Sequence, residues 1–175
     1  SQNDYEKVAI YTKTEFIVIA PASVWFTKQF PKEKWIEFLD HVNDMKVYII
    51  GAPSDIELAE TIISTTKNLN VTNLCGRLNL LQSTALMKQA KMNYVNDSAP
   101  QHLASSVNAP TSTIFCSTVP EFGFGPLSDN AKIIELEKPI DCRPCGLHGH
   151  KSCPEKHFNC ANNININQLV SRLNG

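Results

Sequence analysis

The chain has 175 residues, a length that favours one domain with a sizeable buried core. Sixteen Lys and Arg side chains against seventeen Asp and Glu give a net charge of -1 without a basic block, which disfavours a nucleic-acid or anionic-membrane surface. Hydrophobic residues make up 42% of the sequence, yet no apolar run approaches the ~20 residues of a transmembrane helix. We therefore expect a soluble globular domain with no nucleic-acid partner, no transmembrane segment and a small-molecule ligand.

Short apolar runs alternate along the chain with longer amphipathic segments. Residues 16–20 (FIVIA) form an unbroken, β-branched run closed by Pro21, which is typical of a strand buried on both faces. The other predicted strands cover residues 46–50, 71–74, 92–95, 111–115 and, at one edge of the sheet, 133–136. Residues 1–15 have no clear partner in this sheet, and we interpret them as a linker.

Helices are predicted between these strands. Pro31 opens a helix whose apolar face follows the i, i+3, i+4, i+7 spacing: Trp35, Phe38, Leu39 and Val42. Further helix starts are marked by the capping-box pairs Ser54 with Glu57, Asn79 with Gln82, and Ser98 with Gln101, and a last helix is expected at 165–173. Strands joined through helices require crossover connections. We therefore predict an α/β, Rossmann-like, mostly parallel sheet with helices on both faces.

Candidate ligand-binding residues follow the first two strands, since ligands of open parallel sheets bind beyond the carboxyl ends of the strands. Ser23 and Lys28 come after the first strand, in a loop without a GxGxxG or Walker A motif, which argues against a dinucleotide dehydrogenase and a P-loop ATPase. Lys28 can neutralise a phosphate, and a solvated lysine explains the same residue equally well. Asp55, after the second strand, suits ribose hydroxyls as well as a helix start.

The stretch after the fourth predicted strand, residues 96–102 (NDSAPQH), is the most informative. Backbone N–H groups at the start of the following helix form an anion site suited to a diphosphate. Asp97 is suited to sugar hydroxyls, so the implied ligand carries both a sugar and a diphosphate. Asp-Ser is also a common helix start, and a histidine in the position of His102 often packs inside a protein rather than contacting a ligand.

Four segments, in this order, resemble the ADP-heptose:lipopolysaccharide heptosyltransferases of glycosyltransferase family 9. They are APASVWFTKQFPKEKW (20–35), IGAPSD (50–55), CGRLNL (75–80) and NDSAPQHLAS (96–105), the last being similar to the family's Asp-Ser/Thr-Gly-x-x-His-Leu signature. The resemblance runs from residue 16 to the C-terminus. It implies the C-terminal, donor-binding half of an inverting, two-domain GT-B enzyme of lipopolysaccharide core biosynthesis that uses ADP-heptose.

The resemblance also implies roles for single residues. Contacts to the nucleotide are expected from Ser23 and Lys28 at the diphosphate, Asp55 at the ribose and Leu78 at the adenine. Asp97 is expected to hold the heptose hydroxyls, and the diphosphate pocket is completed by His102 and the backbone of Ser98, Ala99 and Pro100. The family's candidate general base lies in the N-terminal domain, so no catalytic residue is expected here.

These implications define the expected activity and partners. We expect a heptosyltransferase part that is inactive alone and requires an N-terminal acceptor domain, which receives a glycolipid. The expected location is cytoplasmic, with peripheral association at the inner membrane as an option. A non-enzymatic nucleotide-binding or interaction module of the same α/β class is the alternative.

Four of the six cysteines gather in a predicted loop at 142–160, namely Cys142, Cys145, Cys153 and Cys160. With His148 and His150 they offer enough soft ligands for a tetrahedral zinc site, although the second cysteine pair is spaced too widely for a zinc knuckle. Structural zinc, reduced thiols and disulfides all remain open. No cofactor is required by the expected reaction. The predicted nucleotide-sugar-binding domain spans 16–175 and includes this loop.

Overall fold

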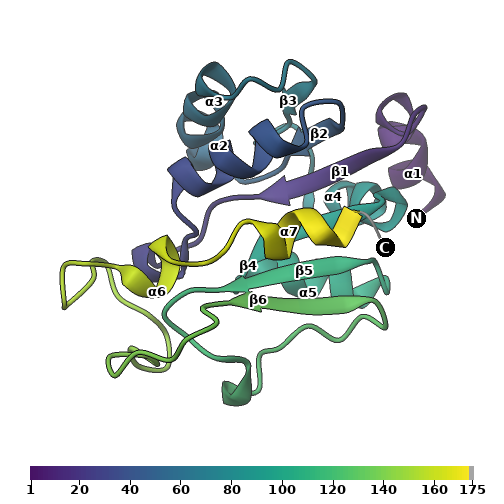
Figure 1. Cartoon of the computed structure of the whole chain (residues 1–175). Coiled ribbons are helices and arrows are strands. Elements are labelled where there is room, and N and C mark those ends of the chain that lie inside the picture. Colours follow the sequence, from purple (N-terminus) through teal and green to yellow (C-terminus); the bar gives the residue numbers. More distant parts are fainter. Residues whose placement is uncertain (174–175) are drawn as a thin grey trace.

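A parallel sheet of six strands lies at the centre of the computed structural model, which describes residues 1–173 (Figure 1). The strands are β1 (Phe16–Ala20), β2 (Lys46–Ile49), β3 (Val71–Asn73), β4 (Met92–Asn96), β5 (Thr111–Phe115) and β6 (Ala131–Glu135). Their order is β3-β2-β1-β4-β5-β6, and every neighbouring pair is parallel. The predicted Rossmann-like sheet is therefore confirmed. From β1 the chain adds β2 and β3 on one side of the sheet and then β4, β5 and β6 on the other. The switch point between β1 and β4 is where such sheets bind ligands.

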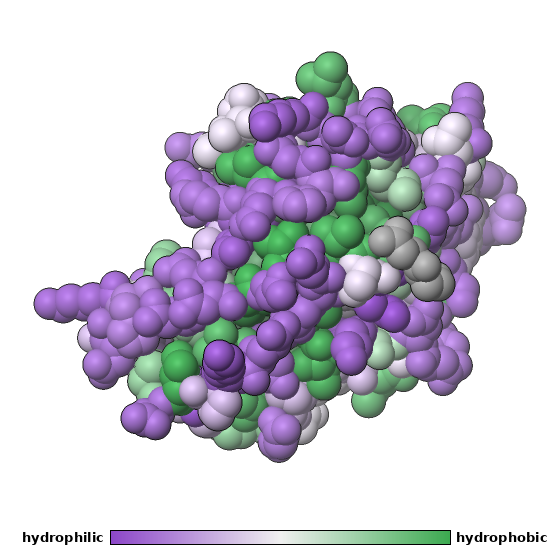
Figure 2. Space-filling model, viewed as in Figure 1, coloured by the Kyte–Doolittle hydropathy of each residue, from purple (hydrophilic) through white to green (hydrophobic). Residues whose placement is uncertain are grey.

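Helices cover both faces of this sheet. One face carries α2 (Lys32–His41), α3 (Ile56–Thr65), α6 (Asn159–Asn162) and α7 (Asn167–Val170), and the other carries α1 (Gln2–Val8), α4 (Leu80–Gln89) and α5 (Ala99–Ser106). Strand β1 serves both layers because its side chains alternate: Ile17 and Ile19 pack with α2, and Val18 packs with α4. In Figure 2, apolar side chains gather in the middle of the view over the sheet, and hydrophilic side chains cover the rim.

The predicted apolar face of α2 is confirmed. Trp35, Phe38 and Leu39 are fully buried, and the Phe38 ring lies 4.6 Å from the ring of Tyr94 on β4, measured between centroids. The Tyr94 hydroxyl donates a hydrogen bond of 3.0 Å to the carbonyl oxygen of Leu169 in α7. Aromatic packing and this bond together fix α2 and α7 against the central strand of the sheet.

The interpretation of residues 1–15 as a linker misses an ordered helix. Residues 2–8 form α1, which packs against α4, and Val8 is fully buried between them. Asp4 is buried as well, and its carboxylate accepts hydrogen bonds from the amino group and the hydroxyl of Ser1. One buried apolar side chain in a helix of seven residues leaves too little periodicity for the helix to be predicted.

Of the three predicted capping boxes, the one at α4 is confirmed. Asn79 and Gln82 exchange hydrogen bonds between side chain and backbone at 2.9 and 3.1 Å. The box at residues 54–57 does not form, because a 3-10 turn (Pro53–Asp55) precedes α3. The start of this turn is held by Asp55, whose carboxylate accepts the N–H of Ala52. Ser98 is the N-cap residue of α5 without a capping side-chain bond, and Gln101 donates instead to the carbonyl oxygen of Phe124.

The structure offers no candidate for a membrane span among residues 1–173, since none of its helices combines the required length with sufficient hydrophobicity.

Candidate functional site

A cleft of about 630 Å³ opens at the carboxyl edge of the sheet, beside the switch point between β1 and β4. The segments after β1, β2 and β3 form its walls together with the first turn of α5. Its volume lies within the ~300–1,000 Å³ typical of small-molecule sites. Size and position at the switch point both indicate a ligand-binding site.

Four of the residues singled out in the sequence line this cleft: Asp55, Leu78, Ala99 and Pro100. The carboxylate of Asp55 accepts the backbone N–H of Ala52 at 2.7 Å and the hydroxyl of Ser54 at 3.1 Å. The two interpretations of Asp55 are therefore compatible, because the same side chain that starts the helix also faces the cleft. At the start of α5, Pro100 has no N–H, so the backbone donors of the first turn of this helix are those of Ser98 and Ala99.

Two glycines allow the walls of this cleft to pack closely, and neither was singled out from the sequence. A Cβ on Gly51 would lie 2.7 Å from Oδ2 of Asp55 and 3.1 Å from the sulfur of Cys75. Gly76 has a φ of +71° and lies against Pro53, where a Cβ would be 3.2 Å from the backbone. A lone glycine after a predicted strand is the sequence signal that could have marked both positions.

A smaller cavity of about 200 Å³ adjoins the cleft at the first turn of α5. It is lined by Lys28, Asp97, Ser98, His102, Phe124, Leu147 and His148. Ser98 thus faces the smaller cavity, and its neighbour Ala99 faces the larger cleft. His102 is exposed, so it is not a packed core histidine. Ser23 lies outside both sets of lining residues, and its carbonyl oxygen accepts a bond from Gln29.

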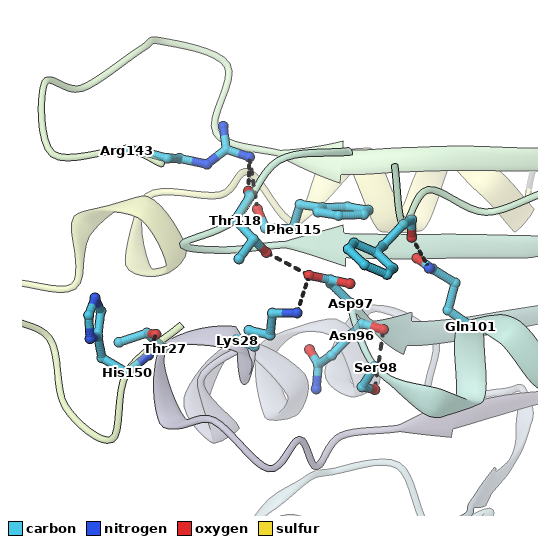
Figure 3. Close-up of polar contacts among 11 residues, drawn as sticks. Thr27, Lys28, Asn96, Asp97, Ser98, Gln101, Phe115, Thr118, Arg143 and His150 are labelled. Atoms are coloured by element: carbon cyan, nitrogen blue, oxygen red, sulfur yellow. Dashed lines mark hydrogen bonds and ion pairs between the residues drawn. The ribbon is translucent and has the colours of Figure 1, made fainter. Parts of the chain in front are cut away.

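Lys28 and Asp97 form an ion pair inside the smaller cavity (Figure 3). The Lys28 ammonium lies 2.6 Å from Oδ2 of Asp97, and the two side chains are only 15% and 6% exposed. The hydroxyl of Thr118 donates to the same carboxylate oxygen at 2.7 Å. The positive charge of Lys28 is therefore already matched within the protein, and an incoming phosphate must compete with Asp97 for it.

Asn96, the last residue of β4, positions the segment that carries Lys28. Its side chain is fully buried, donates to the carbonyl oxygen of Pro21 at 2.8 Å and accepts the N–H of Phe30 at 3.0 Å. Both ends of the segment after β1 are thus attached to the end of β4. The sequence gives no sign of these bonds, since they join residues 66 and 75 positions apart.

The Cys-rich segment, which we define as residues 142–160, is fixed to the same edge of the sheet. Arg143 donates to the carbonyl oxygens of Cys116 and Thr118 at 2.8 and 2.9 Å and pairs with Glu135 at 2.6 Å. Buried Thr27 bonds to the backbone of His150 through both its N–H and its hydroxyl, at 3.1 and 2.8 Å. Figure 3 shows Arg143 beside Thr118 and His150 beside Thr27, so the segment is attached to the loops after β1 and β5.

All six cysteines are free thiols in this structure. Within residues 1–173, no three His, Cys, Asp or Glu side chains come together in an arrangement that could hold a metal ion. The sulfur of Cys142 lies 3.9 Å from Nε2 of His157. Burial, with smaller contributions from neighbouring thiols, raises the pKa of Cys160 to about 11. The thiols of Cys142, Cys145 and Cys153 all act on the pKa of Cys160, so the four cysteines of the segment lie near one another.

Alkylation should separate the buried from the accessible thiols. At about pH 8, iodoacetamide is expected to label Cys142 and Cys153 within the time in which the buried thiols stay unmodified, because only the thiolate reacts. The protected thiols are Cys75, Cys116 and Cys160, whose pKa values are all raised by burial. Mass spectrometry of tryptic peptides measures the labelling, and unfolding in guanidinium should expose all six. Resistance in guanidinium that a reductant removes would instead indicate a disulfide.

Comparison with known proteins identifies the family of this chain. The family model "Glycosyltransferase family 9 (heptosyltransferase)" matches residues 1–173. Lipooligosaccharide heptosyltransferase 2 of Campylobacter jejuni is 27% identical over 129 residues, which cover 72% of this chain and 39% of that protein. Lipopolysaccharide heptosyltransferase 2 of Escherichia coli is 28% identical over 114 residues, covering 62% and 32%. The chain thus spans well under half the length of these curated relatives.

Solved structures match the same fold. ADP-heptose lps heptosyltransferase II of E. coli has a TM-score of 0.78 at 22% identity, covering 99% of this chain and 51% of that one. E. coli heptosyltransferase WaaC, solved with ADP, has a TM-score of 0.69 at 20% identity, covering 91% and 43%. The α/β architecture is therefore that of about half a heptosyltransferase chain. With a family model that matches 1–173, the chain belongs to glycosyltransferase family 9, the heptosyltransferase family.

Proposed function

We propose that this chain binds the donor, an ADP-linked heptose, of an inverting heptosyltransferase of lipopolysaccharide core biosynthesis. The observation that carries the proposal is the pair of adjoining cavities at the switch point of the sheet. The larger has room for a nucleoside, and the smaller, at about 200 Å³, is below the ~300 Å³ of drug-sized sites and suits one sugar ring. Family membership supplies the class of reaction.

The larger cleft has the side chains that an adenosine requires. Leu78, Pro100 and Leu103 offer apolar surface to the base, and the Asp55 carboxylate is an acceptor for the two ribose hydroxyls. The diphosphate then lies at the first turn of α5, between the two cavities, where the N–H groups of Ser98 and Ala99 are available as donors. Asp97 holds hydroxyls of the heptose in the smaller cavity.

The reaction that follows divides between this chain and another part of the protein. An acceptor hydroxyl attacks the anomeric carbon while the bond from that carbon to the diphosphate oxygen breaks, and a base takes the hydroxyl proton. Lys28, His102 and the start of α5 stabilise the departing ADP. We assign the base and the glycolipid acceptor to an N-terminal domain, on the cytoplasmic side of the membrane. This chain alone is then expected to transfer no sugar.

Calorimetric titration with ADP tests donor binding. The wild-type chain should bind ADP, and Asp55→Asn should bind it about tenfold more weakly, since hydrogen bonds to a charged acceptor contribute ~1.5–3 kcal/mol and the amide retains part of this. Asp44→Asn is the matched control, because Asp44 is exposed in the loop before β2, at the opposite edge of the sheet. A folded wild-type sample that gives no heat with ADP would contradict the proposal.

A further inference from the structure

The tip of the Cys-rich segment forms one wall of the smaller cavity. Leu147 and His148 line it together with Lys28 and Asp97, from which they are separated by at least fifty residues of sequence. We propose that His148 binds the sugar of the donor and helps to determine which sugar is accepted. This inference rests on the proposed function and deepens it.

The backbone holds this tip in a fixed turn. Gly146 and Gly149 flank Leu147 and His148, and both glycines have left-handed φ angles, +83° and +82°. On one side, the N–H of Cys145 donates to the carbonyl oxygen of Ser117 at 2.8 Å. On the other, His150 bonds twice to Thr27, as described above. Two side chains are thus presented to the cavity by a turn that is anchored at both ends.

Gly149 also lets the turn approach the segment that carries Lys28. A Cβ at Gly149 would lie 3.0 Å from the hydroxyl oxygen of Thr27 and 3.2 Å from Cγ of Lys28. Any other residue would be strained by the positive φ and would press on these atoms. The close approach keeps His148 on the wall of the cavity that Lys28 and Asp97 share.

The chemistry of the cavity suits a sugar. Asp97 is 94% buried and neutralised by Lys28, so its carboxylate is available as an acceptor without adding net charge. Leu147 and Phe124 are 50% and 49% exposed at the cavity, and such apolar surface packs against the C–H face of a pyranose. The exposed imidazole of His148, another residue lining the cavity, adds a donor and an acceptor. A sugar ring entering here therefore meets both polar and apolar side chains.

Binding of two ligands to three variants tests this assignment. His148→Ala should bind ADP-heptose about threefold to tenfold more weakly, the range for loss of one neutral hydrogen bond, and should bind ADP unchanged. His148→Asn, which retains a donor and an acceptor, should recover part of the loss. His150→Ala is the matched control, since its anchoring bonds come from the backbone. ADP-heptose affinity of His148→Ala equal to that of the wild type, or equal losses for both ligands, would overturn the proposal.

The position of the turn is tested separately. Gly149→Ala should weaken ADP-heptose binding to a similar extent, because the added Cβ would press on Thr27 and Lys28 and displace the tip. Unchanged binding by Gly149→Ala would contradict the fixed turn. A wild-type chain that binds neither ligand removes the proposed function and this inference with it, whereas wild-type binding with no effect of His148→Ala removes the inference alone.

Discussion

Replacing Lys28 with methionine is expected to lower the free energy of unfolding by about 2–4 kcal/mol, because the Asp97 carboxylate then stays buried without its cation. The hydroxyl of Thr118 still donates to that carboxylate, which keeps the loss near the lower end of the range for broken buried pairs. Urea denaturation followed by circular dichroism measures the change. The double variant Lys28→Met/Asp97→Asn should recover most of it, since no charge is then left unpaired.

Lys32→Met is the matched control for this experiment. Lys32 lies four residues further along the same segment, but its side chain is 49% exposed and 4.0 Å from Glu33, so its replacement should change stability by less than about 1 kcal/mol. Equal stability of the Lys28 and Lys32 variants would show that the ion pair is not held in solution. In that event Lys28 would be free to meet a phosphate without competition from Asp97.

The Asp97→Asn variant is expected to lose about ten- to a hundredfold in affinity for ADP-heptose, because a charged acceptor of sugar hydroxyls has been removed. Its affinity for ADP should stay equal or increase slightly, since the change removes a negative charge near the diphosphate and releases Lys28 from its pair. Asparagine can still accept the hydroxyl of Thr118 and fill the same volume. Titration of both ligands into the same preparation measures the contrast.

Other outcomes of that titration have distinct meanings. Equal losses for ADP and ADP-heptose would assign Asp97 to maintenance of the fold around the end of β4. No loss for either ligand would leave the sugar-binding role of Asp97 unsupported. Asp44→Asn again serves as the control, at the opposite edge of the sheet.

Local sequence patterns predicted the sheet and its helices well. The run FIVIA at β1 and the apolar spacing of α2 are encoded within a few neighbouring residues, and every side chain concerned is buried in the structure. α1 shows the opposite case, because its one fully buried side chain, Val8, is buried only by packing against α4, which is distant in the sequence. Periodicity cannot report a contact that involves a single side chain.

The candidate site was predicted in its residues but not in its contacts. Asp97 and Lys28 were both expected near a ligand, yet their pairing depends on bonds from Asn96 to the segment after β1. His148 was considered only as a metal ligand, since nothing in a sequence places a segment 120 residues away against Lys28. Such long-range side-chain contacts arise when the folded elements meet, and no local pattern encodes them.

The two hydrogen bonds between Thr27 and His150 have a consequence for how the smaller cavity can change. The backbone of the tip is carried by Thr27, which is 99% buried, and by the ends of the strands, whereas the side chains at 147 and 148 take no part in these anchoring bonds. Exchanging those two side chains should therefore alter the shape and polarity of the smaller cavity at little cost to folding. Under the proposed function, a library that varies positions 147 and 148 together is expected to yield variants with altered sugar selectivity.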